Sequence, residues 1–157
     1  MTVVMTLIAA LTAVVYLSVS CMISRRIPAS MSATAGLFRS PVVWVSVVWT
    51  VCAMLMMPMM DATQWKGMAF LSVASLAGVG ASPLVKRHRN TFHNVCAFTS
   101  AAASTVIVIA ERPVVLCVWL PYVAATLYDE DRRKWSCTFL AEVCCFMQMI
   151  TICLTNN

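Results

Sequence analysis

The chain has 157 residues, of which 61% are hydrophobic and only 11% are charged, and its mean hydropathy is +0.85. Soluble domains carry about 25% charged residues, so composition excludes a soluble enzyme. It also excludes a nucleic-acid-binding protein, because the net charge of +5 has no soluble fold on which to form a basic face. We expect an all-α, polytopic membrane protein.

Six apolar segments follow one another, separated by charged or polar stretches. They occupy 1–23, 42–60, 67–85, 94–110, 114–128 and 135–154. A spanning helix needs about 20 mostly apolar residues, so the pattern predicts one transmembrane domain over 1–157 with six spans. Alternation of period two, which a membrane barrel needs, does not occur. Arg112-Pro113 breaks the chain between two short segments, so four or five spans, with 94–128 as a re-entrant pair, is the alternative.

The first segment, 1–23, has the length of a signal peptide as well as that of a span. It lacks the positively charged start that signal peptides carry. Ser20-Cys21 is similar to a lipoprotein cleavage site, but Ser18 stands where a larger aliphatic residue is usual. We therefore interpret this segment as the first span.

A short helix is predicted between the first two spans. Pro28 fits the first position of a helix, and Gly36 fits its end. Apolar residues lie between arginines at the two ends of this stretch, as in helices that lie along a membrane surface. We expect 27–38 to lie in the membrane interface, and Trp44 just beyond it to anchor the second span there.

Lysine and arginine gather in alternate separators. The stretches 24–41, 86–93 and 129–134 hold nine of them, whereas the opposite side has only Lys66 and Arg112. Because cytoplasmic loops carry the excess of these residues, the three stretches are predicted to be cytoplasmic and both termini extracytoplasmic. The residues expected to contact anionic lipid headgroups of the bilayer are Arg25, Arg26, Lys86, Arg87, Arg89, Arg132, Arg133 and Lys134.

Small residues recur every four positions in the third and fourth spans, a spacing that lets membrane helices approach closely. The predicted packing positions are Ala74, Gly78 and Ser82, and then Ala97, Ala101 and Thr105. We favour a tight antiparallel hairpin over a solute passage along this seam. Small-residue faces also favour a homo-oligomer or a membrane partner protein.

No metal or cofactor is predicted. His88 and His93 are five residues apart, whereas helical metal pairs prefer three or four. The eight cysteines lie in spans without the spacing of a zinc site. Methionines crowd around Pro58, and although thioethers bind Cu(I), we interpret them as adaptable hydrophobic residues.

Glu142 is the one ionisable residue well inside a predicted span. A charge there costs roughly 2.5–3.5 kcal/mol on insertion scales, so we expect Glu142 to face the bundle, to be protonated, or both. Such residues are candidate functional sites, and a structural hydrogen bond is the alternative role. Side chains at matching depth are its predicted partners: Thr50, Thr99 or Ser100, and Tyr122. His93, at the start of the fourth span, is the second candidate, as a proton-relay or hydrogen-bonding residue. The candidate ligand-binding or proton-relay residues are therefore Glu142, His93, Tyr122 and Ser100.

Three stretches carry a resemblance: IPASMSATAG in the first loop, MAFLSVASLAGVGASP in the third span, and FHNVCAF. They resemble an uncharacterised family of six-helix integral membrane proteins that we associate with gut bacteria of the Bacteroidetes type. The resemblance covers about residues 24–100, with Ala35-Gly36 in place of two aromatic residues. It implies six spans and the bacterial inner membrane, and it implies no activity.

Three functions follow as hypotheses. The first is non-enzymatic binding or transport of a small solute or lipid, with Glu142 as the polar centre. The second is an accessory subunit whose membrane partner does the chemistry. The third is a membrane-embedded lipid hydrolase, which needs a nucleophile or a metal-bound water beside a base.

Overall fold

The computed structural model of the chain describes residues 1–25, 28–38, 40–85, 89–128 and 137–155. Within them the chain forms α-helices and short 3-10 helices, and no strand. The elements are α1 (Thr2–Ser24), η1 (Ser32–Gly36), α2 (Val42–Asp61), α3 (Lys66–Ala81), η2 (Ser82–Leu84), α4 (Arg89–Glu111), η3 (Pro113–Trp119), α5 (Leu120–Tyr128) and α6 (Cys137–Thr155). The predicted all-α class is confirmed for these residues.

Each predicted apolar segment is helical, and five helices are long and apolar enough to cross a membrane. These five are Thr2–Ser24, Val42–Asp61, Lys66–Leu84, Asn90–Glu111 and Thr138–Thr155. The remaining segment, Pro113–Leu127, is shorter and begins as a 3-10 helix. The chain is therefore a membrane protein with at least five candidate spans.

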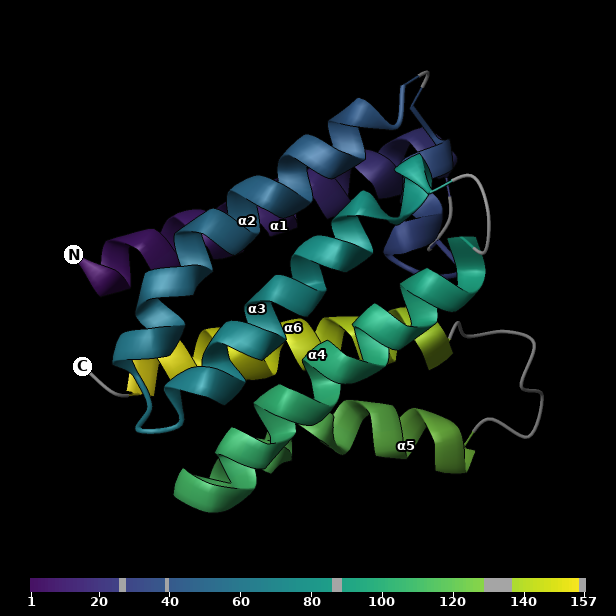
Figure 1. Ribbon diagram of the computed structural model, residues 1–157. Coiled ribbons are helices and arrows are strands. Elements are labelled where there is room, and N and C mark those ends of the chain that lie inside the picture. Colours follow the sequence, from purple (N-terminus) through teal and green to yellow (C-terminus); the bar gives the residue numbers. More distant parts are fainter. Residues whose placement is uncertain (26–27, 39, 86–88, 129–136, 156–157) are drawn as a thin grey trace.

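Consecutive helices run antiparallel, and each packs on the next from α1 to α4 (Figure 1). The last helix, α6, lies against α1, α2, α4 and η3, so it joins the two sides of the bundle. Both the first turn of α1 and the last turn of α6 lie at one end of the molecule (Figure 1). Arg25, in the left-handed conformation, ends α1 at the opposite end.

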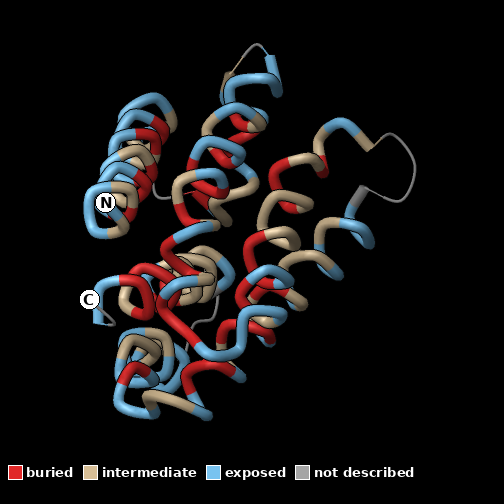
Figure 2. The backbone as a smooth tube through the Cα atoms, turned by 60° about the vertical axis from the view of Figure 1, so that its left-hand side comes forward, coloured by how far each residue is buried: buried red, intermediate tan, exposed pale blue. Residues whose placement is uncertain are grey.

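The buried core includes polar side chains, whereas many large apolar side chains face outward, as expected in lipid. Figure 2 shows buried residues on the sides of the helices that face one another. Gln148 and Ser104 are fully buried, whereas Leu11, Phe98 and Leu127 are mostly exposed. Lipid tails solvate such apolar faces, while polar groups must find partners inside the protein.

The α3–α4 hairpin packs closely where small residues meet. A Cβ on Gly78 would lie 2.7 Å from the Cys96 Sγ atom of α4. Ser72 Oγ donates to the Ser100 carbonyl at 3.0 Å, and Ser100 Oγ donates to the Ser72 carbonyl at 2.8 Å. Gly80, on another face of α3, touches Val48 of α2 in the same way. Thus α3 approaches two neighbouring helices through separate glycines.

The segment between α1 and α2 is packed against the bundle rather than extended away from it. Its 3-10 helix ends at Gly36, as predicted, but it begins at Ser32, so the predicted start at Pro28 is wrong. Thr34 and Ala35 are buried. Pro28 is also buried. The location of segment 27–38 in the membrane interface stays a prediction.

Candidate ligand-binding site

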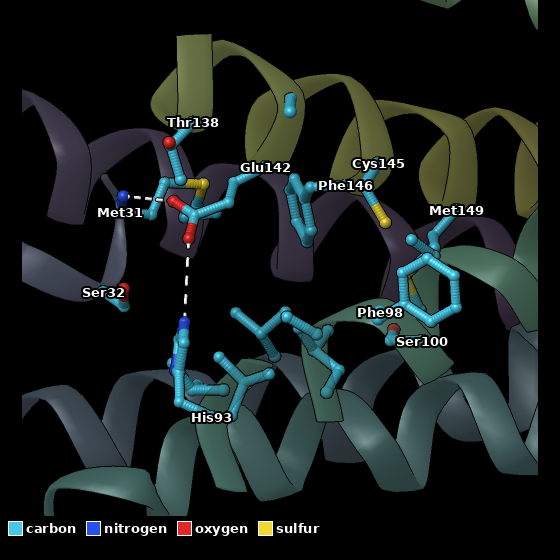
Figure 3. A pocket seen from close by; sticks show the side chains of 18 of the residues that line it. Met31, Ser32, His93, Phe98, Ser100, Thr138, Glu142, Cys145, Phe146 and Met149 are labelled. Atoms are coloured by element: carbon cyan, nitrogen blue, oxygen red, sulfur yellow. Dashed lines mark hydrogen bonds and ion pairs between the residues drawn. The ribbon is translucent and has the colours of Figure 1, made fainter. Parts of the chain in front are cut away.

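A cavity of about 430 Å³, partly open to the outside, lies between the helices. Its walls come from α1, α2, α3, α4, η3, α6 and the η1 segment. Most of the lining is apolar: Ala13, Met31, Val47, Val48, Val51, Leu76, Val79, Ala97, Phe98, Ala101, Ala141, Phe146 and Met149. Glu142 and His93 approach each other from α6 and α4 near one end, and Phe98 and Met149 lie further along (Figure 3). The cavity is therefore an apolar chamber with a polar end.

Glu142 forms the centre of that end. Its Oε2 atom accepts a hydrogen bond from the Met31 backbone N–H, and Ser32 is a further hydrogen-bonding neighbour. Its Oε1 atom lies 3.9 Å from His93 Nε2 (Figure 3). The Glu142 side chain is 21% exposed, and the residue lines the cavity. One acidic side chain thus joins α6, α4 and the segment that precedes η1.

The other ring nitrogen of His93 contacts Ser82, the residue that follows α3. Its Nδ1 atom lies 3.2 Å from Ser82 Oγ. With the imidazole proton on Nε2, the Ser82 hydroxyl donates to Nδ1 and the ring faces Glu142 as a donor. Ser82, predicted as a packing residue, is therefore a hydrogen-bonding partner of the predicted relay histidine.

This Ser82, His93 and Glu142 line contains the three residue types of a hydrolytic triad. In a triad, however, the nucleophile must meet the substrate. Ser82 is only 2% exposed and is not among the residues that line the cavity, whereas the Glu142 carboxylate is. The geometry therefore offers an acidic group to a ligand, with the serine as a positioning residue.

An aromatic cluster continues the polar end toward α1 and α2. The Tyr16 ring lies 5.7 Å from the Trp44 ring and 5.6 Å from the Phe38 ring, and its hydroxyl is 2.8 Å from Thr34 Oγ1. Trp44 is only 4% exposed, which contradicts its predicted role as an interfacial anchor. Its indole N–H has no hydrogen-bond partner within the described chain. Trp44 faces the bundle because its ring packs on Tyr16.

A second polar network, centred on Gln148, lies further along α6. Gln148 Oε1 accepts from Trp119 Nε1 at 2.6 Å. Its Nε2 atom lies 3.0 Å from Ser104 Oγ and 3.2 Å from Thr105 Oγ1. Trp119 lines the cavity, so this network fixes part of the wall. Gln148 was not among the predicted site residues, although an amide in an apolar segment is itself a signal of a polar contact between helices.

The other predicted site and packing residues line the cavity or pack between helices. Ser100 lines the cavity and also bonds to Ser72. Tyr122 packs edge-on against Trp119, 5.9 Å away, and does not line the cavity. Two further predicted packing residues, Ala97 and Ala101, line the cavity, and Ala74 is half-buried in α3. The partners of Glu142 predicted from depth were thus wrong within the described residues, since Met31, Ser32 and His93 surround it.

Several of the predicted headgroup contacts cannot be placed. Arg25 is exposed at the end of α1, and Arg89 begins α4. The predicted contacts Arg26, Lys86, Arg87, Arg132, Arg133 and Lys134 lie outside the described residues, as does His88.

Comparison with known proteins adds no assignment. No protein-family model, no curated protein and no solved structure matches the chain. The resemblance to a six-helix membrane protein family therefore remains a prediction, and the candidate site is supported by the geometry of this chain.

Proposed function

We propose that this protein binds and moves a small, mostly apolar molecule within the membrane, with Glu142 as the group that recognises the polar part of that molecule. The observation that carries the proposal is the cavity of about 430 Å³ whose polar end contains Glu142. Ligand sites are typically cavities of about 300–1,000 Å³ with mainly apolar walls and a few placed polar groups. The chamber has this composition.

The placement of Glu142 favours a ligand over a purely structural carboxylate. Glu142 lines the cavity, and 21% of its side chain is exposed although Met31, Ser32 and His93 contact it. Intramembrane carboxylates in such positions mark substrate or ion pathways.

Six spans with both termini extracytoplasmic belong to this proposal. Lengths favour a sixth crossing, because the seven residues of η3 rise about 14 Å and the nine of α5 about 13 Å, together about 27 Å. The hydrocarbon core is about 30 Å thick. Arginine and lysine in alternate loops favour the orientation and a layer of anionic headgroups at the cytoplasmic face. We place the protein in a bacterial inner membrane, as a homo-oligomer or with a membrane partner.

The test is native mass spectrometry of the protein released gently from its membrane, with metal analysis on the same sample. We expect wild-type protein to carry a lipid or small molecule, and Glu142→Gln to lose it. Asp61→Asn is the matched control, because Asp61 is an exposed carboxylate at the other end of the bundle. A ligand-free wild-type protein that carries a partner chain would contradict the proposal and support an accessory subunit.

A second candidate function, lipid hydrolysis, is favoured by the Ser82, His93 and Glu142 line alone. It requires Ser82 to react, so a fluorophosphonate probe distinguishes the two proposals. We expect no covalent label on Ser82, because its hydroxyl is buried away from the cavity. Labelling that Ser82→Ala abolishes, together with hydrolysis of a phospholipid or acylglycerol, would establish the enzyme instead.

A further inference from the structure

Glu142 and His93 face each other at the polar end of the cavity across more than the length of a hydrogen bond. Glu142 Oε1 lies 3.9 Å from His93 Nε2 (Figure 3), whereas a hydrogen bond between nitrogen and oxygen spans about 2.7–3.2 Å. Both residues line the cavity, and their side chains are 21% and 16% exposed, respectively. Because the gap is shorter than two hydrogen bonds, one polar atom of a ligand can contact both groups at once.

Contacts behind each group keep this gap open. On one side, Glu142 accepts from the Met31 backbone through Oε2, and Ser32 is a further hydrogen-bonding neighbour. On the other side, His93 Nδ1 lies 3.2 Å from Ser82 Oγ. The separation therefore follows from how α6, α4 and the segment before η1 pack, and closing it would disturb these contacts.

The charge of this pair does not select a charged ligand. Among the described residues that line the cavity, Glu142 and His93 are the only acidic and basic side chains. A carboxylate beside a neutral imidazole favours a cationic head, and a carboxylic acid beside an imidazolium favours an anionic one. In the two remaining protonation states the pair has no net charge. An uncharged head is compatible with all four states, and it adds no charge to an apolar chamber.

Hydrogen bonding narrows the uncharged heads to a hydroxyl. A hydroxyl has one donor and two acceptor positions. It can donate to the Glu142 carboxylate while it accepts from His93 Nε2–H, or accept from a carboxylic acid while it donates to an unprotonated Nε2. Where both groups carry the proton, it can accept from both. An ether or a carbonyl oxygen only accepts, so it cannot satisfy the carboxylate.

We propose, resting on the proposed function, that the ligand is an uncharged single-chain lipid alcohol whose hydroxyl bridges Glu142 and His93. Its alkyl chain lies along the apolar walls past Phe98 toward Met149 (Figure 3). The volume of about 430 Å³ is near the lower end of the range for ligand sites, so the chamber takes one alkyl chain.

Two isomeric probes test this assignment. They are dodecan-1-ol and 1-methoxyundecane, which have the same formula, but the ether oxygen cannot donate. Binding of each to purified, delipidated protein is measured by native mass spectrometry titration, with dodecylamine and dodecanoic acid as the charged comparisons. We expect the wild type to bind the alcohol about two- to tenfold more tightly than the ether, the range of one net hydrogen bond. The alcohol should also bind more tightly than the amine and the acid.

Glu142→Leu removes one side of the bridge, so the preference for the alcohol over the ether should disappear. Thr138→Val is the matched control, because it removes another hydroxyl at the same end of the cavity (Figure 3) and should keep the preference.

A magnetic-resonance distance tests the contact with Glu142 in place, should Glu142→Leu not fold. His88→Gln leaves His93 as the only histidine. With ¹⁵N in that imidazole and ¹³C at C1 of dodecan-1-ol, rotational-echo double-resonance should give a distance of about 3.5–4 Å, as expected for a hydroxyl bonded to Nε2. No dephasing of the C1 signal by the imidazole would refute the bridge.

The remaining outcomes separate this proposal from the proposed function. Equal binding of alcohol and ether, a preference that survives Glu142→Leu, or a preference lost in Thr138→Val would refute the bridging hydroxyl. Tightest binding of the amine or the acid would overturn the uncharged head. In each of these cases a native ligand that Glu142→Gln loses would leave the proposed function standing. A native protein that carries no ligand and binds none of the four probes would refute both.

Discussion

Gly80 fixes how closely α3 approaches α2, and Gly80→Ala tests that contact. An added Cβ would lie 2.7 Å from Val48 Cγ1, 2.9 Å from Val48 Cβ and 3.2 Å from Trp49 Cδ1. Carbon atoms pack best at about 3.5–4.0 Å, so the helices must shift or the side chains must leave their rotamers. Overpacking of this kind costs about 1–3 kcal/mol.

Gly67→Ala supplies the matched control, because it is in the same helix and nothing lies within 4 Å of its added Cβ. Both changes replace a helical glycine by alanine, so the difference in helix propensity largely cancels. The free energy of unfolding, measured by denaturation with SDS in mixed micelles and followed by circular dichroism, should be about 1–3 kcal/mol lower for Gly80→Ala than for Gly67→Ala.

The double variant Gly80→Ala with Val48→Ala identifies the contact responsible. Val48→Ala removes the atom at 2.7 Å but leaves Val48 Cβ at 2.9 Å, so rescue should be partial. We expect the double variant to be more stable than the sum of the two single effects by at least about 0.5 kcal/mol. Equal stabilities of the two glycine variants, or strict additivity with Val48→Ala, would refute the close α2–α3 approach.

Three further predictions use the same protein. Ser72→Ala and Ser100→Ala should each lower the free energy of unfolding by about 0.6 kcal/mol, the average for hydrogen bonds between membrane helices; Ser75→Ala in the same helix is the control, and no difference from it would contradict the reciprocal bonds. Gln148→Leu should cost about 1–3 kcal/mol, because it leaves the Trp119 N–H without an acceptor; a variant as stable as wild type would show that the network adds nothing. Alkaline phosphatase fused to the C-terminus should be active and a fused fluorescent protein dark, as expected for an extracytoplasmic terminus; the reverse pattern would refute the orientation.

Helix positions could be predicted closely from hydropathy, because lipid imposes a minimum apolar length on each span. The second span was expected at 42–60 and forms Val42–Asp61, and the fourth was expected at 94–110 and forms Arg89–Glu111. Whether the fifth segment, 114–128, is long enough to span could not be predicted from the sequence. A 3-10 helix rises further per residue than an α-helix, so the 3-10 geometry of η3 lengthens this segment, and no sequence pattern indicates that geometry.

The partners of Glu142 could not be predicted for a different reason. Depth along a span gives one coordinate of a side chain, whereas contact also requires the direction in which its helix face points. Tyr122 matches Glu142 in depth but packs on Trp119. Met31 lies in a loop and contacts Glu142 through its backbone N–H. Every residue but proline has this group, so the sequence does not indicate which backbone N–H will donate.

The hydrogen bond between Glu142 and the segment before η1 also affects how the polar end of the cavity can bind a ligand. A carboxylate has two oxygens and about four acceptor positions. Met31 uses one on Oε2, the side chain and backbone of Ser32 use up to two more, and His93 approaches Oε1 at 3.9 Å. About one acceptor position therefore remains for a ligand donor while Met31, Ser32 and His93 stay in place. Glu142 can hold the η1 segment and the head of a ligand at the same time, so binding at this site needs a prepared carboxylate and not the displacement of the segment that positions it.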